Sequence, residues 1–348
     1  MQVKASILGH FGENKNLLNG QTIKTKIITE ELQNQLGQNQ VLTIDTYGGW
    51  KTLLKAPFQV FKALKNSKNV LIFPAHNGLR IYAPLLSFCR QFFKNRKLHY
   101  VVIGGWLPQF LVKRKSLAKT LKKFDGIYVE TSTMKKALEK QGFQNVFVMP
   151  NCKKLTVLSE NELIYPSGAP YKLCTFSRVN RKKGIEDAIN VVKAVNEKCG
   201  KTVYSLDIYG DVDVGEDEWF ENLKQSFPEY VAYKGSVPFD KSVKVLKPYF
   251  ALLFPTHYWT EGIPGTIIDA YAAGVPVISA RWESFADLVD DGITGIGYAF
   301  DNTEELEGKL IDIANAPHKL NALKMECLKK SESYVPGKVI KTIISHLG

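Results

Sequence analysis

Residues 261–279 read EGIPGTIIDAYAAGVPVIS and are the most informative part of this sequence. A loop of Gly and Pro carries Glu261 and leads into small and apolar residues typical of a buried helix. A second acid, Asp269, follows eight positions after the first. The Gly-Val-Pro break and the apolar run behind it predict that a buried strand follows the helix.

The two acids and the helix start between them suit a charged ligand rich in hydroxyl groups. The first N–H groups of a helix have no partner inside it and carry a partial positive charge, so phosphate binds there. Carboxylates beside a helix start accept hydrogen bonds from sugar hydroxyls. The arrangement suits a nucleotide-sugar; an ordinary helix–strand connection with two exposed acids is the alternative.

A second motif lies upstream at 176–184, with the sequence FSRVNRKKG, and is called the basic loop below. It follows a predicted strand and opens a predicted helix. Arg178 and Lys183 would place two cations at this junction, where they can hold a diphosphate. Arg181 and Lys182 are predicted to be solvated neighbours.

Together these motifs resemble those of retaining glycosyltransferases of the GT-B fold, family 4. That family has two acids separated by seven residues, usually both Glu, whereas the second acid here is Asp269. The basic loop resembles the family's Gly-Arg and Lys-Gly signature, with Ser177 in the usual Gly place. The resemblance is detailed over 172–295 and thin before that. It implies the α/β class and the GT-B fold, with two Rossmann-like βαβ domains facing each other across a cleft.

The resemblance also implies roles for individual residues. Arg178 and Lys183 would bind the donor diphosphate, Glu261 would hold sugar hydroxyls and Asp269 would hold the ribose. His76, at the end of a predicted strand, would contact the donor sugar near its reacting carbon; a structural histidine is the alternative. The expected catalytic residues are therefore His76, Arg178, Lys183 and Glu261. The expected donor-binding set adds Gly20, Gly210, Gly235, Gly262, Ile263, Pro264, Gly265, Thr266 and Asp269.

Two residues are candidates for an acceptor site, and one acidic pair for a metal site. His10 follows the first predicted strand, with a local loop role as the alternative, and Trp106 either stacks on an acceptor sugar or fills its loop. Asp211 and Asp213 form an Asp-x-Asp pattern, which holds a divalent metal in glycosyltransferases of the other common fold. Because the basic loop already offers the counter-charge, we expect a chance match, with no metal and no cofactor.

The net charge of +12 is distributed unevenly along the chain. Residues 46–124 contain no acid and 16 Lys and Arg. A basic, apolar-rich face within 51–123 is expected to attract an anionic membrane surface. An ordinary solvated basic surface is the alternative, and nucleic acid is not expected because no known binding signature accompanies the charge. The interleaved apolar residues are Phe92, Phe93, Leu98, Phe110, Leu111, Val112, Leu117, Leu121 and Phe124.

Length and composition limit the class of protein. A chain of 348 residues with 45% hydrophobic content can form one large or two ordinary domains with full cores. No apolar run approaches the ~20 residues that span a bilayer, and the first residues read as a strand, not a signal peptide. Five scattered cysteines indicate neither a zinc site nor a disulfide framework. We therefore expect a cytoplasmic protein, peripheral at the inner face of the membrane.

Short β-branched runs alternate with amphipathic segments, which is the pattern of βαβ units. A linker at 159–170 is predicted to separate an N-terminal acceptor domain, 1–165, from a donor domain, 166–330. By the resemblance, the tail 330–348 packs back on the first domain. Helices are predicted from Gly20 to Gly37, over 53–64, 79–93 and 184–199, and from 304 onward, with a break at Pro336-Gly337. The predicted strands are 3–8, 41–44, 70–73, 100–103, 127–129, 146–149, 173–176, 205–209, 231–233, 251–254 and 275–279.

The predicted function is retaining transfer of a hexose from a nucleoside-diphosphate sugar to a glycan acceptor. UDP-sugars are favoured over GDP-sugars, and the acceptor is expected to be linked to a lipid diphosphate in cell-surface polysaccharide biosynthesis. No carboxylate of the first domain is an obvious nucleophile, so assistance by the leaving phosphate is favoured over a covalent intermediate. The alternatives are a nucleotide-sugar epimerase of similar fold and a non-catalytic glycan-binding partner subunit, which should have lost the basic-loop cations.

Overall fold

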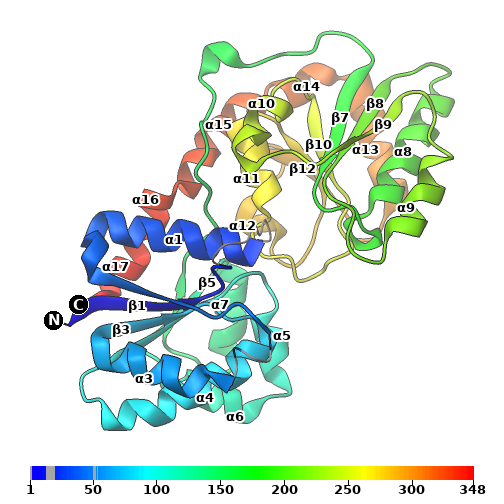
Figure 1. Ribbon diagram of the computed structural model, residues 1–348. Coiled ribbons are helices and arrows are strands. Elements are labelled where there is room, and N and C mark those ends of the chain that lie inside the picture. Colours follow the sequence, from blue (N-terminus) through cyan, green and yellow to red (C-terminus); the bar gives the residue numbers. More distant parts are fainter. Residues whose placement is uncertain (1, 13–19, 50–51, 53) are drawn as a thin grey trace. The chain divides into compact units, whose positions relative to one another are not determined.

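The computed structural model describes residues 2–12, 20–49, 52 and 54–348. The chain forms two compact units, labelled by element in Figure 1. Unit 1 comprises Met1–Lys153 and Tyr334–Gly348, and unit 2 comprises Lys154–Ser333. The division after Lys153 precedes the segment 159–170 that the sequence indicates as a linker.

Unit 1 contains a sheet of six parallel strands in the order β2-β1-β3-β4-β5-β6. All six strands predicted for this half are present. β3 and β4 begin earlier than predicted, because the prediction relied on apolar runs and both strands begin with polar residues. Asn69 of β3, for example, is buried and donates to Lys4 O and Leu347 O. The strands are β1 Val3–Gly9, β2 Val41–Asp45, β3 Ser67–Ile72, β4 Lys97–Val101, β5 Gly126–Val129 and β6 Val146–Val148.

Helices cover both faces of this sheet (Figure 1). The strands place apolar side chains on each face, and both faces must therefore be buried. One face packs against α3 Ala56–Asn66, α4 His76–Cys89, α5 Leu107–Val112, α6 Lys115–Leu121 and α7 Ser132–Lys140. The other face packs against α1 Gly20–Leu36, α16 Pro336–Val339 and α17 Lys341–Leu347. Unit 1 is therefore a three-layer α/β unit that includes the end of the chain.

Several helices of unit 1 contain proline. Pro57 lies in the first turn of α3, where a missing N–H costs nothing, and Pro84 stays inside α4. The helical tail is interrupted next to the predicted break at Pro336-Gly337, because α15 (Lys324–Ser331) ends before it, Val335 is extended and Pro336 begins α16. Leu53, the first residue of the helix predicted over 53–64, lies outside the described residues.

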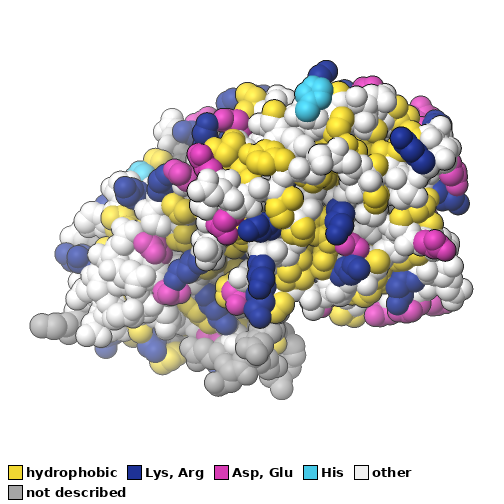
Figure 2. Space-filling model, turned by 90° about the horizontal axis from the view of Figure 1, so that it is seen from above, with side chains coloured by type: hydrophobic (Ala, Val, Ile, Leu, Met, Phe, Trp, Pro, Cys, Tyr) yellow, Lys and Arg dark blue, Asp and Glu magenta, His cyan; other side chains and the backbone are white. Residues whose placement is uncertain are grey.

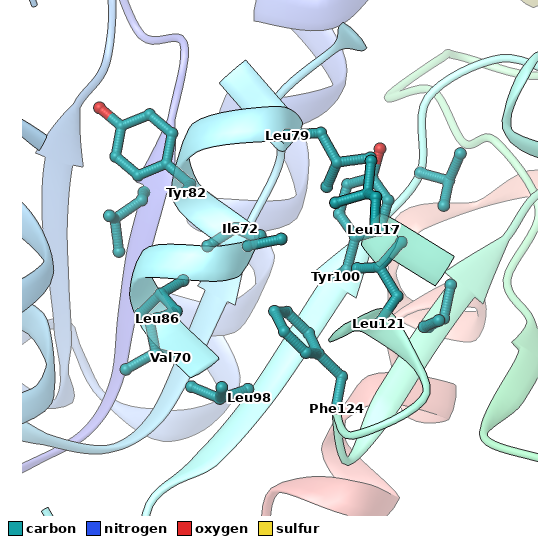
Figure 3. Packing of buried hydrophobic residues seen from close by; sticks show 14 of the residues in the cluster. Val70, Ile72, Leu79, Tyr82, Leu86, Leu98, Tyr100, Leu117, Leu121 and Phe124 are labelled. Carbon is teal, nitrogen blue, oxygen red and sulfur yellow. The ribbon is translucent and has the colours of Figure 1, made fainter. Parts of the chain in front are cut away.

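Part of the predicted basic, apolar face belongs to the core of unit 1. Leu98, Leu117, Leu121 and Phe124 pack against Val70 and other strand residues in the interior (Figure 3), and Leu111 is buried with them. Their spacing is that of the inward stripe of amphipathic helices. Exposed apolar side chains lie elsewhere in the stretch, at Leu54, Phe58, Phe61, Ile81, Phe88, Phe92 and Val112.

Unit 2 also contains six parallel strands, in the order β12-β11-β10-β7-β8-β9. The five strands predicted for this half are present. β12 was not predicted, because every second residue of its sequence GIGY is not β-branched but glycine, and no β-branched run marks it. The strands are β7 Tyr171–Phe176, β8 Tyr204–Tyr209, β9 Val231–Gly235, β10 Ala251–Phe254, β11 Val277–Ala280 and β12 Gly295–Tyr298.

The helices of unit 2 that precede β12 lie between its strands, and the others follow this last strand; several of these helices pack against the apolar cluster of the sheet. The parallel strands end at one edge of the sheet, where such folds collect their binding residues. No helix in the described part of the chain is both long and apolar enough to cross a bilayer. The helices are α8 Ile185–Lys198, α9 Asp217–Lys224, α10 Ser242–Leu246, α11 Gly265–Ala272, α12 Phe285–Leu288, α13 Thr303–Asn315, α14 Pro317–Asn321 and α15 Lys324–Ser331.

Candidate active site

The two motifs of unit 2 meet at the carboxyl edge of its sheet. Lys183 lies in the 3-10 turn η4 (Arg181–Lys183) after β7, and Glu261 lies in the loop after β10. β7 and β10 are neighbouring parallel strands, so the segments that follow them emerge side by side. Lys183 Nζ forms an ion pair with Glu261 Oε1, and the two side chains are only 14% and 16% exposed. The predicted cation and the predicted acid are therefore direct partners.

Gly184 allows this approach. Its φ of 69° lies in the left-handed region, and a Cβ there would stand 1.8 Å from Pro255 O. A side chain at 184 would thus push the basic loop away from the loop that carries Glu261. Asn180 fixes the other end of the turn, since its Oδ1 accepts a hydrogen bond of 3.0 Å from Lys183 N.

Arg178 is held in an exposed position by an acid of the neighbouring loop. Its Nη1 lies 2.9 Å from Asp213 Oδ1, and its side chain is 65% exposed. Asn180 Nδ2 donates to the other oxygen of Asp213 at 2.6 Å. Asp213 therefore orients the guanidinium and leaves most of its N–H groups accessible.

The Asp-x-Asp pattern has a structural explanation that needs no metal. Asp213 accepts from Arg178 and Asn180, while Asp211 is exposed. Among the residues that the structure describes, no group of three or more His, Cys, Asp or Glu side chains could hold a metal ion. The expectation that this site works without a metal remains a proposal.

Two glycines bring the ends of β8 and β9 close to the basic loop. Gly210 has a φ of 131°, and a Cβ there would lie 1.8 Å from Ser177 O, so only glycine fits. Gly210 N donates to Gly235 O at 2.9 Å, and Tyr233 OH donates to Gly210 O at 2.8 Å. Gly235 has a φ of 73° with open space around its Cα. The backbone next to Arg178 is therefore free of side chains from these two positions.

The start of α11 lies directly after the Glu261 loop. Gly262 and Ile263 are buried, Pro264 is the N-cap residue and Gly265 begins the helix. The first turn carries no acid, so its free N–H groups face no competing charge from the helix itself. Thr266 Oγ1 is buried and has no hydrogen-bond partner in the described part of the protein. The start of α11 therefore combines free N–H groups with a buried hydroxyl that has no described partner.

Asp269 occupies a different environment from Glu261. It is 3% exposed in the middle of α11, and its Oδ1 accepts a hydrogen bond of 3.0 Å from Ser242 Oγ at the start of α10. The shorter acid is thus tied to α10, whereas Glu261 is tied to the basic loop. Ser242 was not found from the sequence, because no motif surrounds it.

His257 is a second residue that the sequence analysis missed. Its Nε2 lies 2.8 Å from Asp187 Oδ2 on α8, and its Nδ1 lies 2.5 Å from Asp301 Oδ1. Its backbone N–H donates to Lys182 O at 2.8 Å. His257 therefore fastens the loop after β10 to the basic loop and to α8, which supports the Lys183–Glu261 pair.

Unit 1 has a pocket of its own at the carboxyl ends of β1, β2 and β3. Its volume is about 440 Å³. None of the described residues that line it is an Asp, Glu, Lys or Arg, which contrasts with the basic composition of the surrounding sequence. The lining residues are His10, Gln21, Thr46, Gly49, Pro74, Ala75, His76, Asn77, Gly78 and Tyr82.

His76 begins α4 and stacks on Trp106. The two ring centroids are 3.9 Å apart with an interplanar angle of 28°. Trp106 Nε1 donates to Ile103 O at 2.8 Å, which fixes the indole in its loop. Burial, and then the charge of Arg114, lower the pKa of His76, so the imidazole is neutral at pH 7. The structure thus makes Trp106 a support for His76 and leaves His76 itself at the pocket.

His10 lies in the same pocket, directly after β1. Its Nδ1 is 2.8 Å from Thr22 Oγ1, and its ring contacts Tyr47 edge to face with centroids 4.8 Å apart. Burial lowers its pKa, with Asp45 opposing that effect. Gly20 begins α1, and a Cβ added there would meet no atom of the described residues within 4 Å. Asn19, which precedes it, lies outside the described residues.

The fold resembles solved structures over nearly the whole chain. HepE of Anabaena, solved in complex with UDP, has 13% sequence identity and a TM-score of 0.75, with 100% of this chain and 99% of that one covered. Sucrose-phosphate synthase of Thermosynechococcus elongatus has 14% identity and a TM-score of 0.76, with 99% and 98% covered. Two parallel six-stranded α/β units matching these neighbours define the GT-B fold.

The sequence comparisons concern the second unit. Residues 170–316, which lie in unit 2, match the family model of glycosyl transferases group 1. An uncharacterized glycosyltransferase of Methanocaldococcus jannaschii is 26% identical over 146 residues, 41% of this chain and 36% of the relative. The putative colanic acid biosynthesis glycosyltransferase WcaL of Salmonella typhimurium is 22% identical over 160 residues, 43% of this chain and 38% of the relative. The chain thus spans little more than a third of each of these relatives.

Proposed function

We propose that the protein is a glycosyltransferase that moves a hexose from a nucleoside-diphosphate sugar to a glycan acceptor, with retention of the anomeric configuration. The observation that carries the proposal is the Lys183–Glu261 pair beside the start of α11. A cation, a carboxylate and free helix N–H groups offer a diphosphate and a sugar hydroxyl their partners within one loop cluster.

Donor binding would exchange the partners of these side chains. A diphosphate oxygen can replace Glu261 at Lys183 Nζ, and Arg178 can reach a second oxygen while Asp213 holds it. Glu261 would then accept hydrogen bonds from the sugar hydroxyls and position the ring. In this proposal the ion pair holds both groups close to their bound positions before the donor arrives.

The transition state would gain oxocarbenium character at the sugar and negative charge on the leaving diphosphate. Arg178, Lys183 and the α11 N-terminus would stabilise that departing charge, which is the term expected to matter most. No carboxylate lines the described pocket of unit 1, so no nucleophile for a covalent intermediate is present there. We therefore favour deprotonation of the acceptor by the leaving phosphate, with no metal and no cofactor.

The pocket of unit 1 is proposed as the acceptor site. Its lining offers neutral donors and acceptors, among them His10, Gln21 and Asn77, which suit the hydroxyls of an uncharged sugar. The neutral imidazole of His76 is proposed to contact the donor sugar near the reacting carbon, with Trp106 fixing its orientation.

The nucleoside is proposed to be uridine, with guanosine second. The structural neighbour HepE was solved with UDP. Gly210 and Gly235 leave room for a base beside β8 and β9, and Asp269, held by Ser242, is proposed to bind the ribose. The product would be a cell-surface polysaccharide, since the relative WcaL is named for colanic acid biosynthesis. A lipid-diphosphate-linked acceptor and a peripheral position at the inner face of the membrane complete the proposal.

Calorimetry with UDP, GDP, ADP and CMP, each with Mg²⁺ and with EDTA, tests this proposal. Binding of one nucleoside diphosphate that does not depend on metal, and that is lost in Arg178→Ala, is expected. Lys182→Ala is the matched control, because Lys182 is a cation of the same loop whose Nζ lies over the ring of Tyr258 at 5.6 Å. Absence of binding to every nucleotide would refute the donor site, and binding abolished by EDTA would refute the metal-free mechanism.

A further inference from the structure

The outer face of α3 carries an apolar stripe in addition to its core stripe. Phe58 and Phe61 of α3 are 71% and 50% exposed, and Leu54, two residues before the helix, is 72% exposed. Their spacing of four and three residues places them on one side of a helix. Val60 and Leu64, on the opposite side, are fully buried in the core. The helix is therefore apolar towards both the sheet and the solvent.

A second stripe runs along the neighbouring helix. Ile81 and Phe88 of α4 are 38% and 59% exposed, and Phe92 of the following turn is 72% exposed. Phe88 and Phe92 are in ring contact at 5.7 Å, and Phe61 contacts Phe93 at 5.5 Å. α3 and α4 are neighbours, and the contact between Phe61 and Phe93 links the two stripes. We call Leu54, Phe58, Phe61, Ile81, Phe88 and Phe92 the aromatic surface.

Basic groups surround the aromatic surface. Lys55, Lys62 and Lys65 are exposed on or beside α3, and no acid occurs between 46 and 124 to neutralise them. A pocket of about 290 Å³ is lined by Ser87, Arg90, Gln91 and Lys123. Arg90 also pairs with Asp125 at 2.9 Å, and this acid lies just beyond the stretch.

We propose that the aromatic surface is a docking site for an anionic lipid bilayer. Phenyl rings and aliphatic side chains would enter the boundary between headgroups and acyl chains, while the surrounding lysines bind lipid phosphates. The pocket at Arg90 and Lys123 fits one such headgroup phosphate. The inference deepens the proposed function by giving a lipid-linked acceptor its surface, yet it can be tested without any transferase activity.

The charge of the aromatic surface favours a membrane over a second copy of the chain as its binding partner. A symmetric dimer through this surface would place the same acid-free, lysine-rich patch against itself. Like charges facing each other at close range oppose such a contact. An anionic bilayer instead complements both the charge and the apolar side chains.

Flotation of the full chain with vesicles tests the proposal. Vesicles of phosphatidylcholine containing phosphatidylglycerol should carry the protein, and vesicles of pure phosphatidylcholine should not. The double variants Phe58→Ser/Phe61→Ser and Phe88→Ser/Phe92→Ser should each weaken binding by about tenfold or more, since each loses two exposed rings. High salt should weaken it further.

A matched control comes from unit 2, where Val214 and Ile293 are 103% and 52% exposed. Val214→Ser/Ile293→Ser should leave vesicle binding unchanged. Equal binding by the phenylalanine variants and the wild type, or no binding of the wild type to anionic vesicles, would overturn the proposal. So would a dimer in light scattering that the same variants dissociate. Nucleotide calorimetry on these variants separates the two proposals. Nucleotide affinity should not change, because no residue of the aromatic surface belongs to the donor site.

Discussion

The two units have the same architecture and opposite charge. Unit 1 contains 26 Lys and Arg against 7 Asp and Glu, a formal charge of +19, whereas unit 2 contains 20 against 27, a formal charge of −7. On the face of unit 2 seen in Figure 2, side chains of both signs are interspersed. Since six parallel strands form in both units, the charge of unit 1 is not a requirement of the fold. It instead indicates what that surface contacts.

The two units also differ in the solvent exposure of their Lys–Glu pairs. In unit 1, Lys24 Nζ lies 2.6 Å from Glu130 Oε1, and the side chains are 2% and 3% exposed. Glu130 also accepts from Gly104 N at 3.1 Å. In unit 2, the Lys183–Glu261 pair is several times more exposed and lies among loops. The buried pair should therefore serve stability, and the exposed pair should serve binding.

The largest expected effect is on the buried pair. Lys24→Met leaves a carboxylate without its cation in the interior and should lower the free energy of unfolding by about 3–5 kcal/mol. Denaturant unfolding measures the loss, and hydrogen exchange by peptide should place it in unit 1. Lys24→Met/Glu130→Gln should recover part of it. A loss below about 1 kcal/mol in the single variant would show that the pair does not carry stability.

The exposed pair should behave in the opposite way. Lys183→Ala should reduce turnover of the donor by about 10²–10³-fold, the cost of removing one group that stabilises developing charge. Its unfolding free energy should change by less than about 1 kcal/mol, because solvent and Thr256 can satisfy Glu261. Initial rates and denaturant curves on one preparation provide the test. If Lys183→Ala lowered the unfolding free energy as much as Lys24→Met does, the exposed pair would also serve stability, and the proposed difference between the pairs would be wrong.

A third prediction concerns pH and again separates the units. His99 is fully buried in unit 1, and burial lowers its pKa from 6.5 to about 4. Between these values the unfolded chain binds a proton that the folded chain does not. The stability of unit 1 should therefore fall as the pH decreases from about 6.5 to about 4, by about 3 kcal/mol in total.

Unfolding curves at pH 7 and pH 5 measure this slope. His99→Gln keeps a donor for Asn69 Oδ1, which lies 3.3 Å from His99 Nε2, and removes the titration. In this variant, the unfolding free energy of unit 1 should depend less on pH between pH 5 and pH 7. An unchanged slope would assign the pH dependence to other groups.

Much of the fold was predictable because its signals are local. Short β-branched runs give eleven of the twelve strands, and their order along each sheet explains why Lys183 meets Glu261. The missed strand, β12, is short and rich in glycine. Asn69 shows a further limit, since a polar residue at a strand start is recognised only through its distant partners Lys4 and Leu347.

The supporting residues of the candidate site could not be predicted. Ser242 and His257 act on Asp269 and Asp187, which lie far from them in the sequence, and no motif marks such pairs. The sequence located the basic stretch correctly but assigned Leu117 and Leu121 to its surface. Helical periodicity alone does not distinguish a core stripe from the solvent stripe at Phe58 and Phe61.

The smallest expected effect is that of Ser242→Ala. Removing one hydrogen bond to a buried carboxylate should cost about 1–3 kcal/mol of unit 2 stability. If Asp269 binds ribose, affinity for the nucleoside diphosphate should fall by about tenfold at most, while affinity for inorganic pyrophosphate stays constant. Calorimetry with both ligands makes the comparison. An equal loss of affinity for both ligands would show that the substitution disturbs the cations that bind the diphosphate, and not the ribose contact.

The last helices of the chain have a consequence for synthesis. Val339, Ile340, Ile343 and Leu347 complete the core on one face of the unit 1 sheet, whose strands all lie before residue 150. On the ribosome, unit 2 can fold as soon as its own residues emerge, but unit 1 must wait with an open apolar face until α17 arrives. Of the two units, the one whose strands are translated first therefore completes its core last. During that interval its apolar sheet face is exposed to aggregation.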